Sequence, residues 1–249
     1  MGETYEIGRW RELASSRITF PIDLKRTALV CVDMQRKTVD ATSPRGFTQT
    51  IGKTNPELAQ WYFKKIETET LPNAKRLQAA FRKAGARVVH FVVGPKMKDG
   101  SDLPFAFKNV QQKGLGAWIC FDDPEFQLHP EVAPLEGELV IHKVTMGGFT
   151  GTGAEEMLRN MGIDTIVLIG GHTHACVESS GRAAADLGFK VAVVEDAVIN
   201  YMPLLHDAAM LNFAGFIGRV TTTDELLDEI GAGMAKAAAK PAAGRAARA

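Results

Sequence analysis

The chain has 249 residues, 29 Lys and Arg residues against 29 Asp and Glu residues, and a hydrophobic fraction of 45%. This length fits a single domain with a substantial core, and zero formal charge leaves no electrostatic footprint for nucleic acid. No apolar stretch approaches the roughly 18 residues of a membrane span. The first ten residues lack a secretion signal, and three cysteines make no disulfide framework, so we expect a cytoplasmic protein without a membrane partner.

Short apolar runs alternate with helical patterns along the chain. We expect strands over residues 27–32, 87–93, 138–142, 164–169, 190–194 and 219–222. We expect helices over residues 71–84, 152–162, 175–187 and 204–214, the second opened by a capping box from Thr152 to Glu155. Strands separated by helices predict an α/β fold, a three-layer α/β/α sandwich with a mainly parallel central sheet.

Three segments fall outside this alternation. Residues 36–60 are polar and rich in Gly and Pro, which predicts an ordered excursion or lid after the first strand. Residues 94–134 contain five prolines and predict a long irregular insertion after the second strand. Residues 231–249 form an Ala-rich basic tail that we expect to be loosely ordered, so residues 1–230 are predicted to be one domain.

Three reactive side chains follow three different strands. Asp33 comes directly after the first strand, Lys143 after the third, and Cys176 opens the helix after the fourth. Taken singly, such an Asp is commonly a turn former, such a Lys is solvated, and such a Cys packs in a core. In a parallel sheet, however, all three lie at the carboxyl edge, where α/β proteins bind their ligands.

The chemistry of this set is coherent. A helix N-terminus and a nearby Lys143 ammonium both favour the thiolate of Cys176, which predicts a lowered thiol pKa. Asp33 can accept the thiol proton and return it to a leaving amine. Backbone N–H groups in residues 170–176 can stabilise an oxyanion. Together these groups predict attack on a carbonyl and expulsion of ammonia or an amine.

The same residues carry a resemblance to a known family. Residues 170–197 read GGHTHACVESSGRAAADLGFKVAVVEDA and resemble the signature segment of the isochorismatase-like cysteine hydrolases. Residues 32–35 (VDMQ) resemble the first strand of that family, and residues 134–152 resemble its lysine strand and the helix cap after it. His206 and residues 221–226 resemble its closing segment, so the resemblance covers roughly residues 25–230.

The resemblance implies roles for individual residues. Cys176 would be the nucleophile, Asp33 the general base and acid, and Lys143 the group that orients Asp33 and stabilises charge. A cis peptide would join Gly171 and His172, and the backbone N–H groups of His172 and Cys176 would form the oxyanion hole. Substrate-binding candidates are Gln35, Phe149, His172 and His174.

The resemblance also implies a reaction class. It points to the amidohydrolase branch, whose members act on ureidoacrylate, N-carbamoyl compounds and other small amides, and to a homo-oligomer, either a dimer or a tetramer. Residues 92–96 lack the Asp-x-His motif that holds a metal in nicotinamidase-like members, so we expect neither a metal nor a cofactor. The alternatives are isochorismatase-type vinyl ether hydrolysis with Asp33 as the acid, and a non-catalytic binding protein.

Several neighbouring residues allow more than one interpretation. His172 and His174 are either turn residues or groups that face the substrate or tune the thiolate, and a zinc site with Cys176 is a third option that Lys143 opposes. Trp61, Tyr62 and Phe63 are expected to be core or subunit-interface residues, with a stacking platform as the alternative. Arg36 and Arg45 are either solvated or contacts for a substrate carboxylate. Cys31 is expected to be inert packing, and Cys120 has no assigned role.

Overall fold

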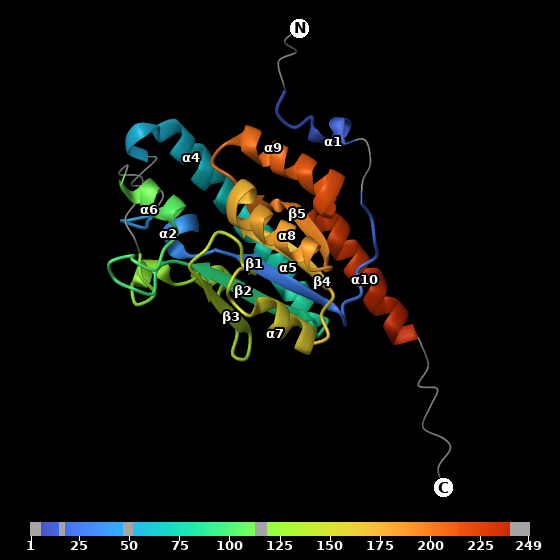
Figure 1. Ribbon diagram of the computed structural model, residues 1–249. Helices are drawn as coiled ribbons and strands as arrows, with labels where there is room; N and C mark the ends of the chain where they lie inside the picture. Colours follow the sequence, from blue (N-terminus) through green and yellow to red (C-terminus); the bar gives the residue numbers. More distant parts are fainter. Residues whose placement is uncertain (1–5, 15–17, 47–51, 113–118, 240–249) are drawn as a thin grey trace.

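A six-stranded parallel sheet forms the centre of the computed structural model, which describes residues 6–14, 18–46, 52–112 and 119–239 (Figure 1). The strand order is β3-β2-β1-β4-β5-β6, and every neighbouring pair is parallel. The strands are β1 (Thr27–Val32), β2 (Arg87–Val93), β3 (Leu139–Lys143), β4 (Thr165–Gly171), β5 (Lys190–Ile199) and β6 (Arg219–Thr221). The predicted three-layer α/β architecture is therefore confirmed.

Helices cover both faces of the sheet (Figure 1). One face carries α7 (Ala154–Asn160), α8 (Glu178–Asp186) and α9 (Pro203–Asn212). The other face carries α4 (Pro56–Lys65), α5 (Leu71–Lys83) and α10 (Thr223–Ala239). Shorter pieces are α1 (Trp10–Leu13), α2 (Arg36–Val39), α6 (Phe105–Gln112), and the turns η1 (Ile66–Thr70), η2 (Pro124–Phe126), η3 (Pro130–Val132), η4 (Thr173–Val177) and η5 (Phe213–Ile217).

The apolar run of β1 explains why this strand is central. Ala28, Val30 and Val32 pack into the core under α7, α8 and α9, whereas Leu29 and Cys31 pack into the core under α4, α5 and α10. Because successive side chains of a strand point to opposite faces, a strand buried on both sides must be apolar throughout. Cys31 is fully buried, in agreement with its predicted packing role.

Two helix starts differ from prediction. The helix expected from residue 175 begins at Thr173 with the π-helical turn η4 and continues as α8. The capping box predicted at Thr152 is wrong, because Gly153, with φ of 70°, is the N-cap residue of α7 and Glu155 instead pairs with Arg159. The left-handed backbone at Gly153 starts the helix one residue later than the Thr-x-x-Glu spacing suggests.

The irregular segments are more helical than the sequence indicates. Residues 56–60, predicted as part of an excursion, begin α4, which continues through η1 into α5. The predicted loose tail is wrong for residues 231–239, which extend α10, and its remainder lies outside the described residues. The insertion after β2 contains α6, η2 and η3, and a bridge between Gln35 and Leu128 ties it to the segment after β1. Within the described ranges, no helix is long and apolar enough to cross a bilayer.

Candidate active site

Asp33 occupies a left-handed backbone position immediately after β1. Its φ is 51°, and it is the one non-glycine residue with positive φ in the described part of the chain. Asp tolerates this conformation better than most residues, and the backbone N–H of Asp33 donates to Phe91 O at 3.0 Å. The turn places the carboxylate at the carboxyl edge of the sheet, where it is 2% exposed.

Lys143, the last residue of β3, reaches this carboxylate from two strands away. Its Nζ donates to Asp33 Oδ2 at 2.8 Å, to Thr145 O at 3.1 Å and to Met146 O at 2.9 Å. Lys143 is 1% exposed, and burial opposes its charge, but the Asp33 carboxylate and the Cys176 sulfur together raise its pKa. The lysine is therefore a fixed ammonium, held by three acceptors.

Cys176 lies in η4, between the carboxyl end of β4 and α8. Ala175 N and Val177 N both donate to His172 O, at 3.1 and 3.2 Å, which winds this turn. Ser180 Oγ donates to Cys176 O at 2.6 Å and accepts from Gly148 N at 2.9 Å, which ties the turn to the loop after β3. The thiol interacts with the side chains of both Asp33 and Lys143.

The predicted lowering of the thiol pKa is wrong for this resting geometry. Burial, and secondly the negative charge of Asp33, raise the pKa of Cys176 to about 12, and the Lys143 ammonium offsets them only in part. The helix N-terminus that motivated the prediction is a π-helical turn facing a buried carboxylate. The resting site is therefore a protonated thiol beside an Asp–Lys ion pair.

One oxygen of the Asp33 carboxylate is available to accept the thiol proton. Asp33 Oδ2 accepts from Lys143, whereas Oδ1 is buried and accepts no hydrogen bond of standard geometry from the described residues. Because the thiol interacts with the Asp33 carboxylate and Oδ1 is not engaged by Lys143, Oδ1 can accept the thiol proton while the ion pair through Oδ2 stays intact.

The backbone before Cys176 has the geometry that the resemblance implies. The peptide bond between Gly171 and His172 is cis. Gly170 has φ of 108°, and a Cβ there would overlap Val32 O of the adjacent strand, so glycine is required on both counts.

His172 is engaged by aromatic neighbours. Its Nε2 lies 2.9 Å from Tyr62 Oη, and because that hydroxyl donates to Thr38 O at 3.0 Å, the imidazole is the donor to Tyr62. Burial, assisted by the neighbouring His174, lowers the pKa of His172 to about 4. His172 is thus neutral near pH 7.

His174 has a different partner. Asn200 Nδ2 donates to its Nδ1 at 2.7 Å, and the Tyr201 ring packs edge-on at 5.5 Å. Burial is the main cause that lowers its pKa. Both imidazoles are therefore engaged by neighbouring side chains, and no cluster of three or more His, Cys, Asp or Glu side chains with metal-binding geometry occurs in the described ranges.

Two of the residues predicted to bind substrate make structural contacts instead. Gln35 is fully buried, its Nε2 donates to Phe126 O at 2.8 Å, and its Oε1 accepts from Val93 N at 2.8 Å, so the amide clamps the insertion onto β2. Phe149 packs against the Phe91 and Phe189 rings in the core, with ring centroids 5.8 Å apart in each pair. Neither side chain has the free surface expected of a substrate contact.

The arginines considered for a substrate carboxylate already have protein partners. Arg36 pairs with Asp40 and Glu125, and Arg45 pairs with Asp123.

The aromatic cluster divides between core and surface. Tyr62 and Phe63 face the core, whereas Trp61 is 39% exposed.

Sequence reasoning missed Lys37, four residues after Asp33. Its Nζ donates to Val93 O and lies 5.4 Å from the centroid of the Phe126 ring. The only signal in the sequence is a basic residue close behind a strand-end Asp, which by itself fits a solvated side chain.

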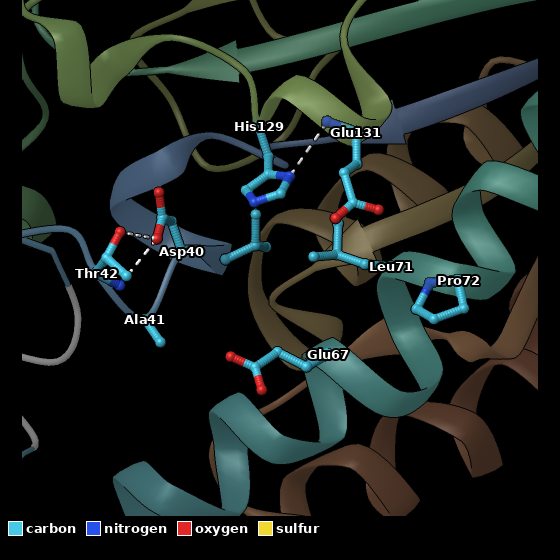
Figure 2. Close-up of a pocket in the computed structure, with 9 residues that line it drawn as sticks. Asp40, Ala41, Thr42, Glu67, Leu71, Pro72, His129 and Glu131 are labelled. Carbon is cyan, nitrogen blue, oxygen red and sulfur yellow. Dashed lines mark hydrogen bonds between the residues drawn. The ribbon is translucent and has the colours of Figure 1, made fainter.

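A separate hollow of about 310 Å³ opens between α2, η1, α5 and η3 (Figure 2). Its lining residues are Val39, Asp40, Ala41, Thr42, Glu67, Leu71, Pro72, His129 and Glu131. Asp40 accepts from Thr42, and Glu131 pairs with Lys75 at 2.7 Å (Figure 2 shows the first of these). None of the three reactive side chains lines this hollow, so it is distinct from the site.

Fold and site together define an α/β enzyme with an acid, an ammonium and a thiol at the carboxyl edge of a parallel sheet. The isochorismatase domain matches residues 27–225. The chain therefore belongs to the isochorismatase family, and it is a hydrolase of that family.

The relatives that match include proteins of similar length. A Bacillus subtilis (strain 168) protein named "Uncharacterized isochorismatase family protein YwoC" is 29% identical over 212 residues, which cover 85% of this chain and 98% of that protein. A Pantoea ananatis protein named "Ureidoacrylate amidohydrolase RutB" is 27% identical over 236 residues, which cover 90% of this chain and 90% of that protein.

Solved structures show the same fold. The crystal structure of a cysteine hydrolase from Pseudomonas syringae pv. phaseolicola 1448A matches with a TM-score of 0.70 and 23% sequence identity. The match covers 87% of this chain and 97% of the hydrolase chain. An isochorismatase family protein from Desulfovibrio vulgaris gives a TM-score of 0.67 and 24% identity, with 83% and 98% covered.

Proposed function

We propose that the chain is a cysteine-dependent amidohydrolase that cleaves the C–N bond of a small amide, ureido or N-carbamoyl compound. The observation that carries the proposal is the buried 2.8 Å contact between Lys143 and Asp33, with the Cys176 thiol interacting with both side chains. The ion pair stabilises the anion that Asp33 needs in order to act as a base, because Lys143 keeps one of its oxygens permanently engaged.

The first half-reaction acylates the thiol. Asp33 takes the thiol proton, the Cys176 sulfur forms a bond to the substrate carbonyl carbon, and the carbonyl oxygen becomes an oxyanion. The C–N bond then breaks, and the proton on Asp33 passes to the departing nitrogen. The backbone N–H groups of His172 and Cys176 are the proposed oxyanion donors, and a donor of this kind contributes about 3–4 kcal/mol to lowering the barrier.

The second half-reaction releases the acid. Asp33 takes a proton from water, the resulting hydroxide attacks the thioester carbon, and the S–C bond breaks with return of the proton to sulfur. Asp33 is the side chain that accepts and returns the proton in both half-reactions. The Pantoea ananatis relative is named for ureidoacrylate, so ureido acids are the first compounds to test.

The test is ammonia release from a panel of ureido acids, N-carbamoyl amino acids and aryl amides. The wild type is compared with Cys176→Ala and with Lys83→Met, which changes an exposed lysine on α5. The proposal expects turnover by the wild type and by Lys83→Met and none by Cys176→Ala. Turnover that survives Cys176→Ala, or its absence across the whole panel, would contradict it.

A further inference from the structure

Lys37 brings a second cation to the edge of the sheet that holds the reactive residues. Its Nζ donates to the carbonyl of Val93, the last residue of β2. Val93 is paired in register with Lys143 on β3, and Asp33 lies on the other side, after β1. The ammonium of Lys37 therefore lies at the carboxyl end of β2, the strand between β3 and β1, and it interacts electrostatically with Asp33, Lys143 and Cys176.

Lys37 differs from the neighbouring cations in what it contacts. Lys143 is neutralised by Asp33, and Arg36 by Asp40 and Glu125. Lys37, in contrast, has a backbone carbonyl and an aromatic ring as contacts, and no carboxylate within 4.0 Å among the described residues. With the thiol protonated, Asp33, Lys143 and Lys37 leave one positive charge in excess at the site.

The surroundings of Lys37 make this excess costly. Its Nζ lies 5.4 Å from the centroid of the Phe126 ring, and Phe126 belongs to a small apolar cluster with Val92 and Ile119. Burial lowers the pKa of Lys37 to about 8; Lys143 acts in the same direction, whereas Asp33, Cys176 and Cys120 oppose it. A partly desolvated cation gains most from an anionic ligand, because the ligand replaces solvation that the protein has removed.

We propose that Lys37 binds the carboxylate of the substrate, and that the enzyme is therefore selective for amide or ureido compounds that carry a carboxylate near the scissile bond. This inference rests on the proposed function for its catalytic meaning. Lys37 is a specificity-determining residue: it binds the substrate carboxylate, while Cys176 and Asp33 carry out the bond changes.

Alkylation of Cys176 tests the charge preference without any turnover. Iodoacetate and iodoacetamide react alike, since the sulfur bonds to the methylene carbon, iodide leaves and the thiol proton is lost, but only iodoacetate carries a carboxylate. Rates at the Cys176 peptide are measured by mass spectrometry for the wild type, Lys37→Met, Lys37→Arg and the exposed-lysine control Lys83→Met. Thermal unfolding of each variant confirms that it is folded.

We expect Lys37→Met to slow the reaction with iodoacetate selectively. In Lys37→Met the iodoacetate rate falls about 10- to 100-fold relative to the iodoacetamide rate, as for loss of a charged hydrogen bond, whereas Lys37→Arg retains most of the preference. Lys83→Met keeps the wild-type ratio. An unchanged ratio in Lys37→Met, or an equal fall for both reagents, would overturn the assignment.

Turnover provides the second arm. For an N-carbamoyl amino acid, Lys37→Met is expected to raise KM about 10- to 100-fold, with a much smaller change for the corresponding neutral N-carbamoyl amino amide. Equal effects on both substrates would refute the role of Lys37. If the wild type hydrolyses neither of these compounds nor any other member of the panel, the proposed function fails, and the alkylation ratio still decides whether Lys37 recognises a carboxylate.

Discussion

Removing the Lys143 ammonium should lower the unfolding free energy, because it leaves the buried Asp33 carboxylate without its ion-pair partner. In Lys143→Met, Asp33 stays 2% exposed and loses the partner 2.8 Å away. Breaking a buried ion pair typically costs about 3–5 kcal/mol of unfolding free energy. The expected loss of unfolding free energy at pH 7 is therefore about 4 kcal/mol.

The pH dependence follows from the same argument. The pKa of Lys143 is raised, so its contribution is fully present below its ordinary value of 10.5 and is lost only as pH rises through the higher folded value. In the wild type, the contribution of the Lys143 ammonium to stability should therefore stay constant between pH 5 and pH 8. In Lys143→Met the loss of stability should shrink toward pH 5, because acid favours the neutral form of a carboxyl that is buried without a partner.

The measurement is thermal and urea unfolding at about pH 5, 6, 7 and 8. For a chain of this length, 1 kcal/mol corresponds to about 2–4 °C, so the melting temperature at pH 7 should fall by about 8–16 °C. The double variant Asp33→Asn with Lys143→Met should recover much of this loss and show no pH slope, since Asn also tolerates the left-handed backbone at residue 33.

Two outcomes would refute this reasoning. One is a Lys143→Met protein as stable as the wild type at pH 7. The other is a deficit that neither changes with pH nor responds to Asp33→Asn, which would place the loss in packing rather than in the unpaired charge. Lys83→Met, at an exposed position, controls for the general removal of a lysine and should change stability by less than about 0.5 kcal/mol.

Three further predictions concern the packing and titration of the site. Because the pKa of Cys176 is raised to about 12, its reaction with iodoacetamide should accelerate about tenfold per pH unit from pH 7 to 10; a plateau near pH 8 would contradict the raised pKa. Gly148→Ala would drive a methyl group into the Phe91 ring and should cost about 1–3 kcal/mol in urea unfolding, whereas unchanged stability would show that the ring yields freely. Tyr62→Phe removes the hydroxyl that bonds His172 and should cost about 1–3 kcal/mol in the same assay; a cost near zero would mean that this hydrogen bond contributes no net stability.

The sequence allowed the framework of the site to be predicted because that framework depends on local pattern. The apolar run before Asp33 fits a strand buried on both faces, and the alternation with helices indicates a mainly parallel sheet whose strand ends share an edge. Asp33 and Lys143 could therefore be expected together, although 110 residues separate them, and the structure places them 2.8 Å apart.

The roles of individual polar atoms could not be predicted in this way. Gln35 looked like a substrate ligand until its amide was found between Phe126 O and Val93 N, 91 and 58 residues away. The pKa of Cys176 is raised and not lowered as predicted, because burial and the Asp33 charge outweigh the effect of a helix N-terminus.

For this protein, then, the order of residues determined the strands, the parallel sheet and the three chemical groups at its edge, since periodicity and spacing report local burial and chain direction. Only the tertiary structure decided which polar atoms are already engaged and which are open to a ligand. Lys37 illustrates the difference: its lack of a carboxylate partner among the described residues depends on contacts with Val93 and Phe126, which no local pattern encodes.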